Sequence, residues 1–312
     1  REKMETHLYE KYGEEFVVDR IGQRSSRDDV FYQARIYPKS IIGTNRQWDN
    51  YYYGELSMEI ERDGLGGIAD TYGEISRSLE IEDLLMPKTE ELFGNMVRLK
   101  VDQRYQKRNP NGYFISFLNP TLEEVFENME QEPENHRLLL DLDVYIFKRI
   151  ENEAEKEERR EQIFEFVQYL KKVGLFDYLE LGVIFIDERV LAPSYDDFAR
   201  EIRTTREVRE VIEGELVRMP PRELRGRMSI ELQNEVEEMS EEELLASMYE
   251  IRKDELNYDD LRKNHGQYYT WIYSLGMLES RYRSSITEED KDRKYDNIDD
   301  IRFSVYREYI YY

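Results

Sequence analysis

Residues 138–150 read LLLDLDVYIFKRI, and this stretch decides the fold. Its leucine, valine and isoleucine side chains recur at every second position, which predicts a β-strand with one buried face. Residues 151–173 carry apolar side chains at helical spacing, and residues 178–190 form a second apolar run that is typical of a strand. Strand, helix and strand in this order predict a crossover unit whose two strands pair in parallel.

The sequence before this unit predicts a mixed domain of strands and helices. Strand-like runs occupy residues 16–21, 30–37, 51–61, 96–105 and 113–118. A helical pattern covers residues 69–93, where Pro87 is expected to split the helix because proline lacks a backbone N–H. We predict an N-terminal α+β domain over residues 1–130 and a second α/β-like unit over residues 131–216, and the two units can share one sheet.

Later in the chain the pattern becomes mainly helical. Residues 193–216 are expected to form a helix, and between residues 244 and 282 apolar side chains recur at steps of three, four or seven and form one stripe. Residues 301–312 alternate apolar and charged side chains, as a closing strand does. The predicted fold class is therefore α+β, with mixed sheets followed by a mainly helical region over residues 222–312 that ends in a strand.

The composition limits the classes of partner and of chemistry. The chain has 69 acidic and 45 basic residues and a net charge of −24, which repels phosphate backbones and anionic lipid, so no nucleic-acid partner is expected. It has no cysteine, which excludes disulfides, thiol nucleophiles and thiolate metal sites. Its three histidines lack metal-ligand spacing, so neither a metal nor a cofactor is predicted.

The sequence contains no membrane-spanning pattern. An apolar run of about 18 residues, which a transmembrane helix needs, is absent. The chain opens at Arg1 without an initiator methionine or a signal peptide. We therefore expect a fragment, and any membrane contact would be made through an anchor in a preceding segment that has been removed.

Three carboxylates on the two strands of the crossover unit are the candidate catalytic residues. Asp141 and Asp143 lie two positions apart on one strand, so both point to one face, and Glu180 belongs to the following strand. Paired carboxylates on neighbouring strands can hold a cation or act on a glycosidic bond. The same spacing also fits a solvated strand face, because the leucines between them form the buried face and carboxylates are seldom fully buried.

Two groups of aromatic residues are the candidate binding surfaces. The first consists of Trp48, Tyr51, Tyr52 and Tyr53, and the second consists of Tyr268, Tyr269, Trp271 and Tyr273. Exposed tryptophan and tyrosine stack on sugars and dominate protein interfaces, whereas in an alternating strand half of them would be core. In a helix the second group would surround nearly the whole turn, so residues 231–256 or a partner would have to cover its far side. A partner requires Trp271 to be exposed.

The opening residues resemble a family of bacterial surface proteins. Residues 8–18 read LYEKYGEEFVV, and residues 31–39 read FYQARIYPK. Together they resemble the start of the extracytoplasmic part of small membrane-anchored or lipid-anchored proteins from Gram-positive bacteria, a largely uncharacterised family. The resemblance covers about the first 40 residues. It implies a location outside the cytoplasm, behind a hydrophobic segment or a lipidated cysteine, rather than an activity.

These observations predict a noncatalytic binding or structural module at the bacterial cell surface, with a protein or a cell-wall component as its partner. One alternative is a hydrolase of cell-wall or polysaccharide substrates that uses Asp141, Asp143 or Glu180. Another is a cytoplasmic or phage-encoded regulatory protein whose partner is a protein. The position of the carboxylates separates the first two hypotheses, because a hydrolase needs them to converge in a cleft.

Overall fold

The computed structural model describes residues 1–26, 29–61, 64–116, 120–186, 188, 211–212, 215–216, 253–254, 256–258, 261 and 268–274. They form two larger sheets, one two-stranded sheet and several helices, which confirms the mixed helix and strand content expected from the sequence. The predicted closing strand at residues 301–312 and most of the predicted helical region at residues 222–267 lie outside them. None of the described helices is both long and apolar enough to cross a membrane.

The N-terminal sheet is an antiparallel meander of four strands in chain order. Its strands are β1 (Phe16–Ser26), β2 (Asp29–Pro38), β3 (Gly54–Glu61) and β4 (Gly64–Asp70). Helix α1 (Glu2–Tyr12) ends at Gly13, whose φ of 71° lies in the left-handed region that favours glycine. Met4 and Leu8 of α1 are buried against the strands, so α1 covers one face of this sheet.

The connection from β2 to β3 is a loop of short 3₁₀ turns that leaves the N-terminal sheet. The turns are η1 (Lys39–Ile41), η2 (Asn45–Trp48) and η3 (Asn50–Tyr52). We call residues 39–53 the β2–β3 loop. The sequence predicted a strand from residue 51, but β3 begins only at Gly54, because the tyrosines before it pack against the second sheet instead.

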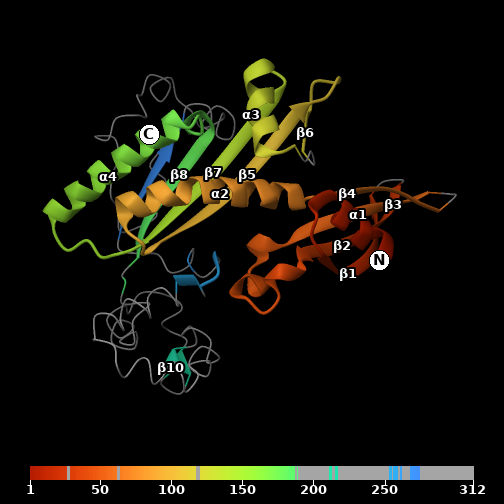
Figure 1. Cartoon of the computed structure of the whole chain (residues 1–312), viewed down its shortest axis with the longest axis horizontal. Helices are drawn as coiled ribbons and strands as arrows, with labels where there is room; N and C mark the ends of the chain where they lie inside the picture. The colour runs from red at the N-terminus through yellow and green to blue at the C-terminus, as the bar shows by residue number, and fades with distance from the viewer. Residues whose placement is uncertain are drawn as a thin grey trace.

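Helix α2 (Tyr72–Phe93) begins beside the N-terminal sheet and then runs along one face of the second sheet (Figure 1). The prediction that Pro87 splits this helix is wrong, since α2 is continuous through it. Pro87 is exposed, so water can reach the Asp83 carbonyl that has lost its helical donor. The long helix thereby carries the chain from the first sheet to the face of the second.

The second sheet has five strands in the order β11-β8-β7-β5-β6. They are β5 (Val97–Arg108), β6 (Phe114–Ile115), β7 (His136–Phe147), β8 (Leu179–Ile186) and β11 (Tyr268–Tyr273). Strands β7 and β8 pair in parallel across α4 (Glu153–Lys172), which confirms the crossover unit, and the other pairs are antiparallel. The sheet takes strands from both sides of residue 130, where the sequence placed a domain boundary.

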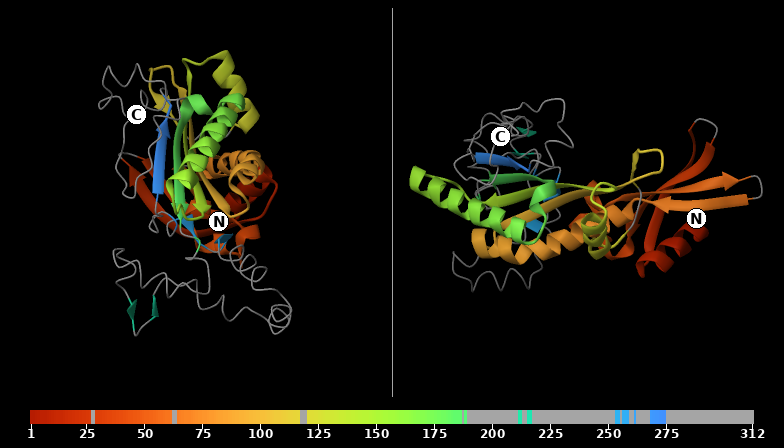
Figure 2. Two further views of the ribbon diagram at one scale, coloured as in Figure 1. Left: turned by 90° about the vertical axis from the view of Figure 1, so that its left-hand side faces the viewer. Right: turned by 90° about the horizontal axis from the view of Figure 1, so that it is seen from above.

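Helices cover one face of the second sheet (Figure 2). They are α2, α4 and α3 (Leu122–Gln131), and the turn η4 (Phe176–Tyr178) leads into β8. Leu140 and Leu142 of β7 pack with Phe166 of α4 in the main core. As the alternation predicted, Asp141 and Asp143 lie between these buried residues and project to the other face.

Two segments that were predicted to be helical form strands. Tyr268–Tyr273 is β11, paired with β8 at the edge of the sheet, so the helical stripe predicted through it is wrong. Because side chains alternate in a strand, Tyr268 packs on the helix-side core and Tyr269 on the opposite face. The pair β9 (Val211–Ile212) and β10 (Glu215–Leu216) is antiparallel, where a helix was also expected.

Candidate functional site

The face of the second sheet that points away from the helices carries two rows of polar and aromatic residues. In the first row, backbone pairing aligns Lys100, Asp143, Gly182 and Trp271. In the next row, it aligns Asp102, Asp141, Glu180 and Tyr273. Residues paired across strands project to the same side of a sheet, so the structure brings the three predicted carboxylates onto one face.

Gly182 lets the Trp271 ring lie directly on the sheet. A Cβ atom at Gly182 would be 2.5 Å from the six-membered ring of Trp271 and 2.6 Å from Asp143 Oδ1. Carbon atoms in contact are about 3.5–4 Å apart, so only glycine leaves room for this approach. The indole and the Asp143 carboxylate therefore meet above Gly182, where Tyr145 donates a hydrogen bond to Asp143 Oδ2 at 3.3 Å.

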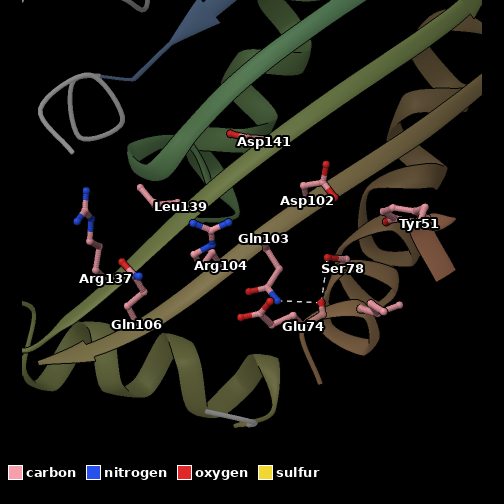
Figure 3. Close-up of a pocket in the computed structure, with 11 residues that line it drawn as sticks. Tyr51, Glu74, Ser78, Asp102, Gln103, Arg104, Gln106, Arg137, Leu139 and Asp141 are labelled. Atoms are coloured by element: carbon pink, nitrogen blue, oxygen red, sulfur yellow. Dashed lines mark hydrogen bonds between the residues drawn. The ribbon is translucent and has the colours of Figure 1, made fainter. Parts of the chain in front are cut away.

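A cavity of about 650 Å³ lies where the edge of β5 meets α2 and the β2–β3 loop (Figure 3). Its charged lining residues are Glu74, Asp102, Arg104, Arg137 and Asp141. Its neutral lining residues include Tyr51, Ser78, Gln103, Gln106 and Leu139. Carboxylates, guanidinium groups and amides thus share one cavity, whose volume falls in the range that small ligands occupy. We call it the β5 cavity.

Hydrogen bonds fix the α2 side of the β5 cavity. Gln103 Nε2 and Ser78 Oγ both donate to the backbone oxygen of Glu74, at 2.8 and 3.0 Å (Figure 3). Burial raises the pKa of the Glu74 carboxyl above its usual range. On the sheet side, Lys100 forms an ion pair with Asp102, and the Arg104 side chain is exposed. The sheet side therefore presents the charged groups that a ligand can reach.

Two tyrosine hydroxyls close part of the β5 edge. The Tyr51 hydroxyl donates to Val101 O at 2.8 Å, and the Val101 N–H donates to the same hydroxyl oxygen at 3.4 Å. At Leu99, two positions before Val101 on β5, the backbone oxygen accepts a hydrogen bond from the Tyr258 hydroxyl. Burial raises the pKa of both tyrosines well above the usual value, so both hydroxyls keep their protons.

The first predicted aromatic group contributes mainly to a core. Tyr51 and Tyr52 meet edge to face with ring centroids 4.9 Å apart, and both pack with Tyr258 in the cluster that joins the β2–β3 loop to the second sheet. Tyr53 is half-buried beneath the guanidinium of Arg35, whose Cζ is 4.6 Å from the ring centroid. Trp48 is the last residue of η2, and its side chain lies outside the described part of the chain.

The second predicted aromatic group is divided between the two faces of β11. Tyr268 is partly buried against the helix-side core, and Tyr269 is buried in the cluster beneath the β2–β3 loop. Trp271 is half-buried above Gly182. The backbone of Tyr273 belongs to β11, and its side chain lies outside the description. Among the described side chains of this group, Trp271 is the one beside the rows of charged residues.

The predicted carboxylates separate into different surroundings. Asp141 lines the β5 cavity, Asp143 lies beside Trp271, and Glu180 is buried next to Asp141 in the row. No group of three or more His, Asp or Glu side chains is placed to hold a metal ion in the described part of the chain. The carboxylates therefore share a face, but only Asp141 of the three faces the cavity.

The basic and amide residues of the site were not predicted from the sequence. Arg104 and Gln106 of β5 and Arg137 of β7 line the cavity beside Asp141. The sequence of β5, VRLKVDQRYQKR, alternates apolar with polar residues, and this alternation could have identified Arg104 and Gln106 as residues of the polar face. Arg137 follows the same alternation one position before the leucine run of β7.

Comparisons with known proteins add little to this description. No family model matches the chain, and no curated protein matches it either. In structure the chain is similar to a DUF5037 family protein from Ruminococcus gnavus, at 20% sequence identity and a TM-score of 0.35. The similar region covers 64% of this chain and 78% of that chain. A likeness this slight carries no argument about function.

Proposed function

We propose that this chain is a noncatalytic binding module at the bacterial cell surface and that its ligand is a glycan of the cell wall. The observation that carries the proposal is the β5 cavity, whose sheet side presents Asp102, Arg104, Arg137 and Asp141. Sugar hydroxyls both donate and accept hydrogen bonds, so a glycan site needs guanidinium or amide donors next to carboxylate acceptors. This cavity contains all of these groups.

Aromatic side chains beside the charged residues support the same ligand class. Tyr51 lines the β5 cavity, and Trp271 lies in the neighbouring row, next to Asp143. Tyrosine and tryptophan combine a large apolar ring with a polar end, so they pack against the apolar face of a sugar while the surrounding groups bond its hydroxyls. A phosphate-rich ligand is disfavoured by the net charge of −24.

The placement of the carboxylates favours binding over hydrolysis. A glycosidase positions two carboxyl groups on either side of the scissile bond and gives them different proton affinities. In the β5 cavity Asp102 and Asp141 are cross-strand neighbours on one wall, and Lys100 forms an ion pair with Asp102. Carboxylates on one wall can accept hydrogen bonds from hydroxyl groups without flanking a bond.

The cell-surface location is part of the proposal and rests on the opening of the chain. Residues 8–18 and 31–39 resemble the start of anchored extracytoplasmic proteins. The test is the reading frame upstream of residue 1. An apolar segment or a lipidation motif there supports the location, and a start codon directly before residue 1 contradicts it and favours the cytoplasmic alternative.

Co-sedimentation with purified Gram-positive cell walls tests the binding activity. We expect the wild-type chain to sediment with the walls, and we expect Arg104→Gln and Asp141→Asn to lower the affinity about tenfold each, as the loss of a charged hydrogen bond does. Arg24→Gln is the matched control, because Arg24 is an exposed arginine of β1, in the other sheet. Circular dichroism checks that each variant is folded.

Two results would contradict the glycan proposal. One is the absence of wild-type sedimentation with the walls. The other is equal sedimentation of wild type, Arg104→Gln and Asp141→Asn, which would place the binding elsewhere on the chain. Sedimentation that persists after the glycan is digested, but is lost when wall proteins are stripped, would assign the cavity to a protein ligand instead.

A hydrolase remains the second candidate function, and one observation favours it. Asp141 and Glu180 are directly paired across the parallel strands β7 and β8, so two carboxyl groups lie side by side. The test is the release of reducing ends from purified cell walls. Release that is abolished by Asp141→Asn or Glu180→Gln would establish hydrolysis, and no release by the wild-type chain would exclude it for this substrate.

A further inference from the structure

A second cavity, of about 680 Å³, is also lined by the β2–β3 loop and shares no lining residue with the β5 cavity. Its walls come from that loop, from the later turns of α2, from the start of β5 and from residues 253–254. The groups that matter for its chemistry are Arg46, Tyr52, Glu82, Arg98 and Lys253. We call it the α2 cavity, and its ligand is independent of the cell-wall proposal.

Glu82 is the buried acid of the α2 cavity. Its Oε1 lies 3.4 Å from the Tyr258 hydroxyl oxygen, whose proton is donated to Leu99 O. Its Oε2 is inaccessible to solvent and has no hydrogen-bond partner among the described residues. A buried polar atom without a partner is unfavourable, and a ligand group that reaches Oε2 would relieve that cost. Burial also raises the pKa of this carboxyl to about 7, so it can carry a proton near neutral pH.

Cationic groups from three separate parts of the chain line the α2 cavity together with this carboxyl. The Arg98 guanidinium lies over the Tyr258 ring, with Cζ 4.2 Å from the centroid, and its Nη1 donates to Lys253 O at 3.3 Å. A guanidinium has five N–H donors, so these contacts leave donors for a ligand. Arg46 is exposed beside the Tyr52 ring, and Lys253 donates to Asn95 O.

We infer that the α2 cavity binds a small oxyanion, a carboxylate or a phosphate-like group, held by Arg46, Arg98 and the carboxyl group of Glu82. Guanidinium groups match the geometry of oxyanions and bind them through charge-assisted hydrogen bonds. A protonated Glu82 donates a further hydrogen bond, whereas an ionised Glu82 repels the anion and competes with it for the same arginines.

Three further carboxylates line the α2 cavity and act against an anion. They are Asp83, Glu90 and Asp254, and all three side chains are exposed at the rim. Exposed charges are screened by water and salt within about 10 Å, so their effect on a ligand inside the cavity is weak. The charge that a ligand meets inside the cavity is therefore set by Arg98 and Glu82, whose side chains are more buried than the three rim carboxylates.

The charges around Glu82 make the binding depend on pH. The groups that face it are Asp83 on its own helix, Arg46, Tyr51 and Tyr52 from the β2–β3 loop, Arg98 from β5 and Tyr258. Binding of an anion takes up a proton at Glu82, so the affinity is highest below the pKa of that carboxyl and falls as the pH rises through it. Above that pKa the fall is about tenfold for each pH unit.

Isothermal titration with sulfate and with succinate tests the inference, because both probes keep their charge between pH 6.5 and 8.5. Ionic strength is held constant with sodium chloride. We expect the wild-type affinity to fall roughly tenfold or more over this range. Glu82→Gln, which imitates the protonated carboxyl, should bind at pH 8.5 as tightly as the wild type does at pH 6.5. Arg46→Gln should bind more weakly at every pH, while Arg24→Gln should match the wild type.

The two probes separate the sources of the oxyanion. Binding of succinate alone assigns the cavity to carboxylates, and binding of sulfate alone assigns it to tetrahedral anions such as phosphate groups. The inference is overturned if the wild type binds neither probe at pH 6.5, or if Glu82→Gln keeps the pH dependence of the wild type. Thermal unfolding shows whether each variant is folded. If Glu82→Gln does not fold, Arg46→Gln still tests the inference, because Arg46 is exposed.

Discussion

Tyr51 and Val101 bond to each other in both directions, since the tyrosine hydroxyl donates to the valine oxygen at 2.8 Å and accepts from the valine N–H at 3.4 Å. A side chain from the β2–β3 loop thus takes the place that a neighbouring strand would occupy beside β5. This contact, with the rings of Tyr52 and Tyr258 around it, joins the N-terminal part of the chain to the second sheet.

Removal of this hydroxyl should weaken the junction. We expect Tyr51→Phe to lower the free energy of unfolding by about 1–3 kcal/mol, because it leaves the buried N–H and C=O of Val101 without their partner. Urea denaturation measures the change. Tyr9→Phe is the control, since Tyr9 is exposed, and its effect should stay within about 0.5 kcal/mol. Equal stability of Tyr51→Phe and wild type would show that water replaces the hydroxyl.

A methyl group at Gly182 should displace the Trp271 ring. The added Cβ would be 2.5 Å from the ring, so we expect Gly182→Ala to lower stability by about 1–3 kcal/mol and to shift the Trp271 fluorescence. Trp48→Phe, as a background, leaves Trp271 as the sole tryptophan. At the control position Gly67, the nearest atom to an added Cβ is 3.5 Å away, so Gly67→Ala should leave the fluorescence unchanged. An unshifted spectrum in Gly182→Ala would contradict the stacked geometry.

The stability of the protein should depend on pH through Glu82. Burial raises its pKa to about 7, so the folded state holds a proton that the unfolded state, with a pKa of about 4.3, has released. The contribution of Glu82 to the free energy of unfolding is therefore fully present below pH 4.3, and it is lost as the pH rises through the folded-state pKa of about 7. The loss is about 4 kcal/mol at most, since the two pKa values differ by about 2.7 and each unit of difference is worth about 1.4 kcal/mol.

Glu82→Gln isolates this effect from the other carboxylates. The glutamine does not ionise, so the stability difference between Glu82→Gln and wild type should increase in favour of the variant between pH 4.5 and 7.5. Urea titrations at matched ionic strength measure the difference. A difference that stays constant with pH would mean that Glu82 keeps an ordinary pKa in the folded protein.

Asp49 should hold the Tyr258 backbone in place. This buried carboxylate accepts from the Tyr51 N–H through Oδ1 at 3.0 Å and from the Tyr258 N–H through Oδ2 at 2.8 Å. In Asp49→Asn one acceptor becomes a donor, so one of these N–H groups loses its partner. We expect the Tyr258 amide to exchange its hydrogen about tenfold faster or more, as measured by hydrogen-exchange mass spectrometry. Asp19→Asn, on β1, should leave that amide unchanged.

The crossover unit was predictable because each element had enough local signal. Alternating leucines predicted β7 and placed Asp141 on the less buried face, while the helical spacing of α4 fixed the parallel pairing with β8. These are short-range patterns. The rule that a strand, a helix and a strand in sequence form a crossover between parallel strands then predicts how β7 and β8 pair. The shared face of Asp141 and Glu180 follows from them directly.

Strand β11 could not be recognised in the same way. Its sequence YYTWIY also fits a helical stripe, and its nearest partner on β8 lies 83 residues away in sequence, since Tyr268 pairs with Phe185. Tertiary pairing, rather than local propensity, decides such a segment. The same holds for Tyr52 and Tyr269, which looked like surface candidates until the β2–β3 loop was seen to pack on the second sheet.

The hydroxyl caps on β5 also bear on how the protein behaves at high concentration. An unpaired strand edge is a template on which a second chain can add a strand, and such addition leads to aggregation. Between β6 and the start of β5, the hydroxyls of Tyr51 and Tyr258 occupy the backbone groups of Val101 and Leu99. A chain that lacks these two hydroxyls would therefore expose unpaired backbone groups on β5, at which a second copy of the chain could pair. We therefore expect these tyrosines to limit aggregation as well as to stabilise the fold.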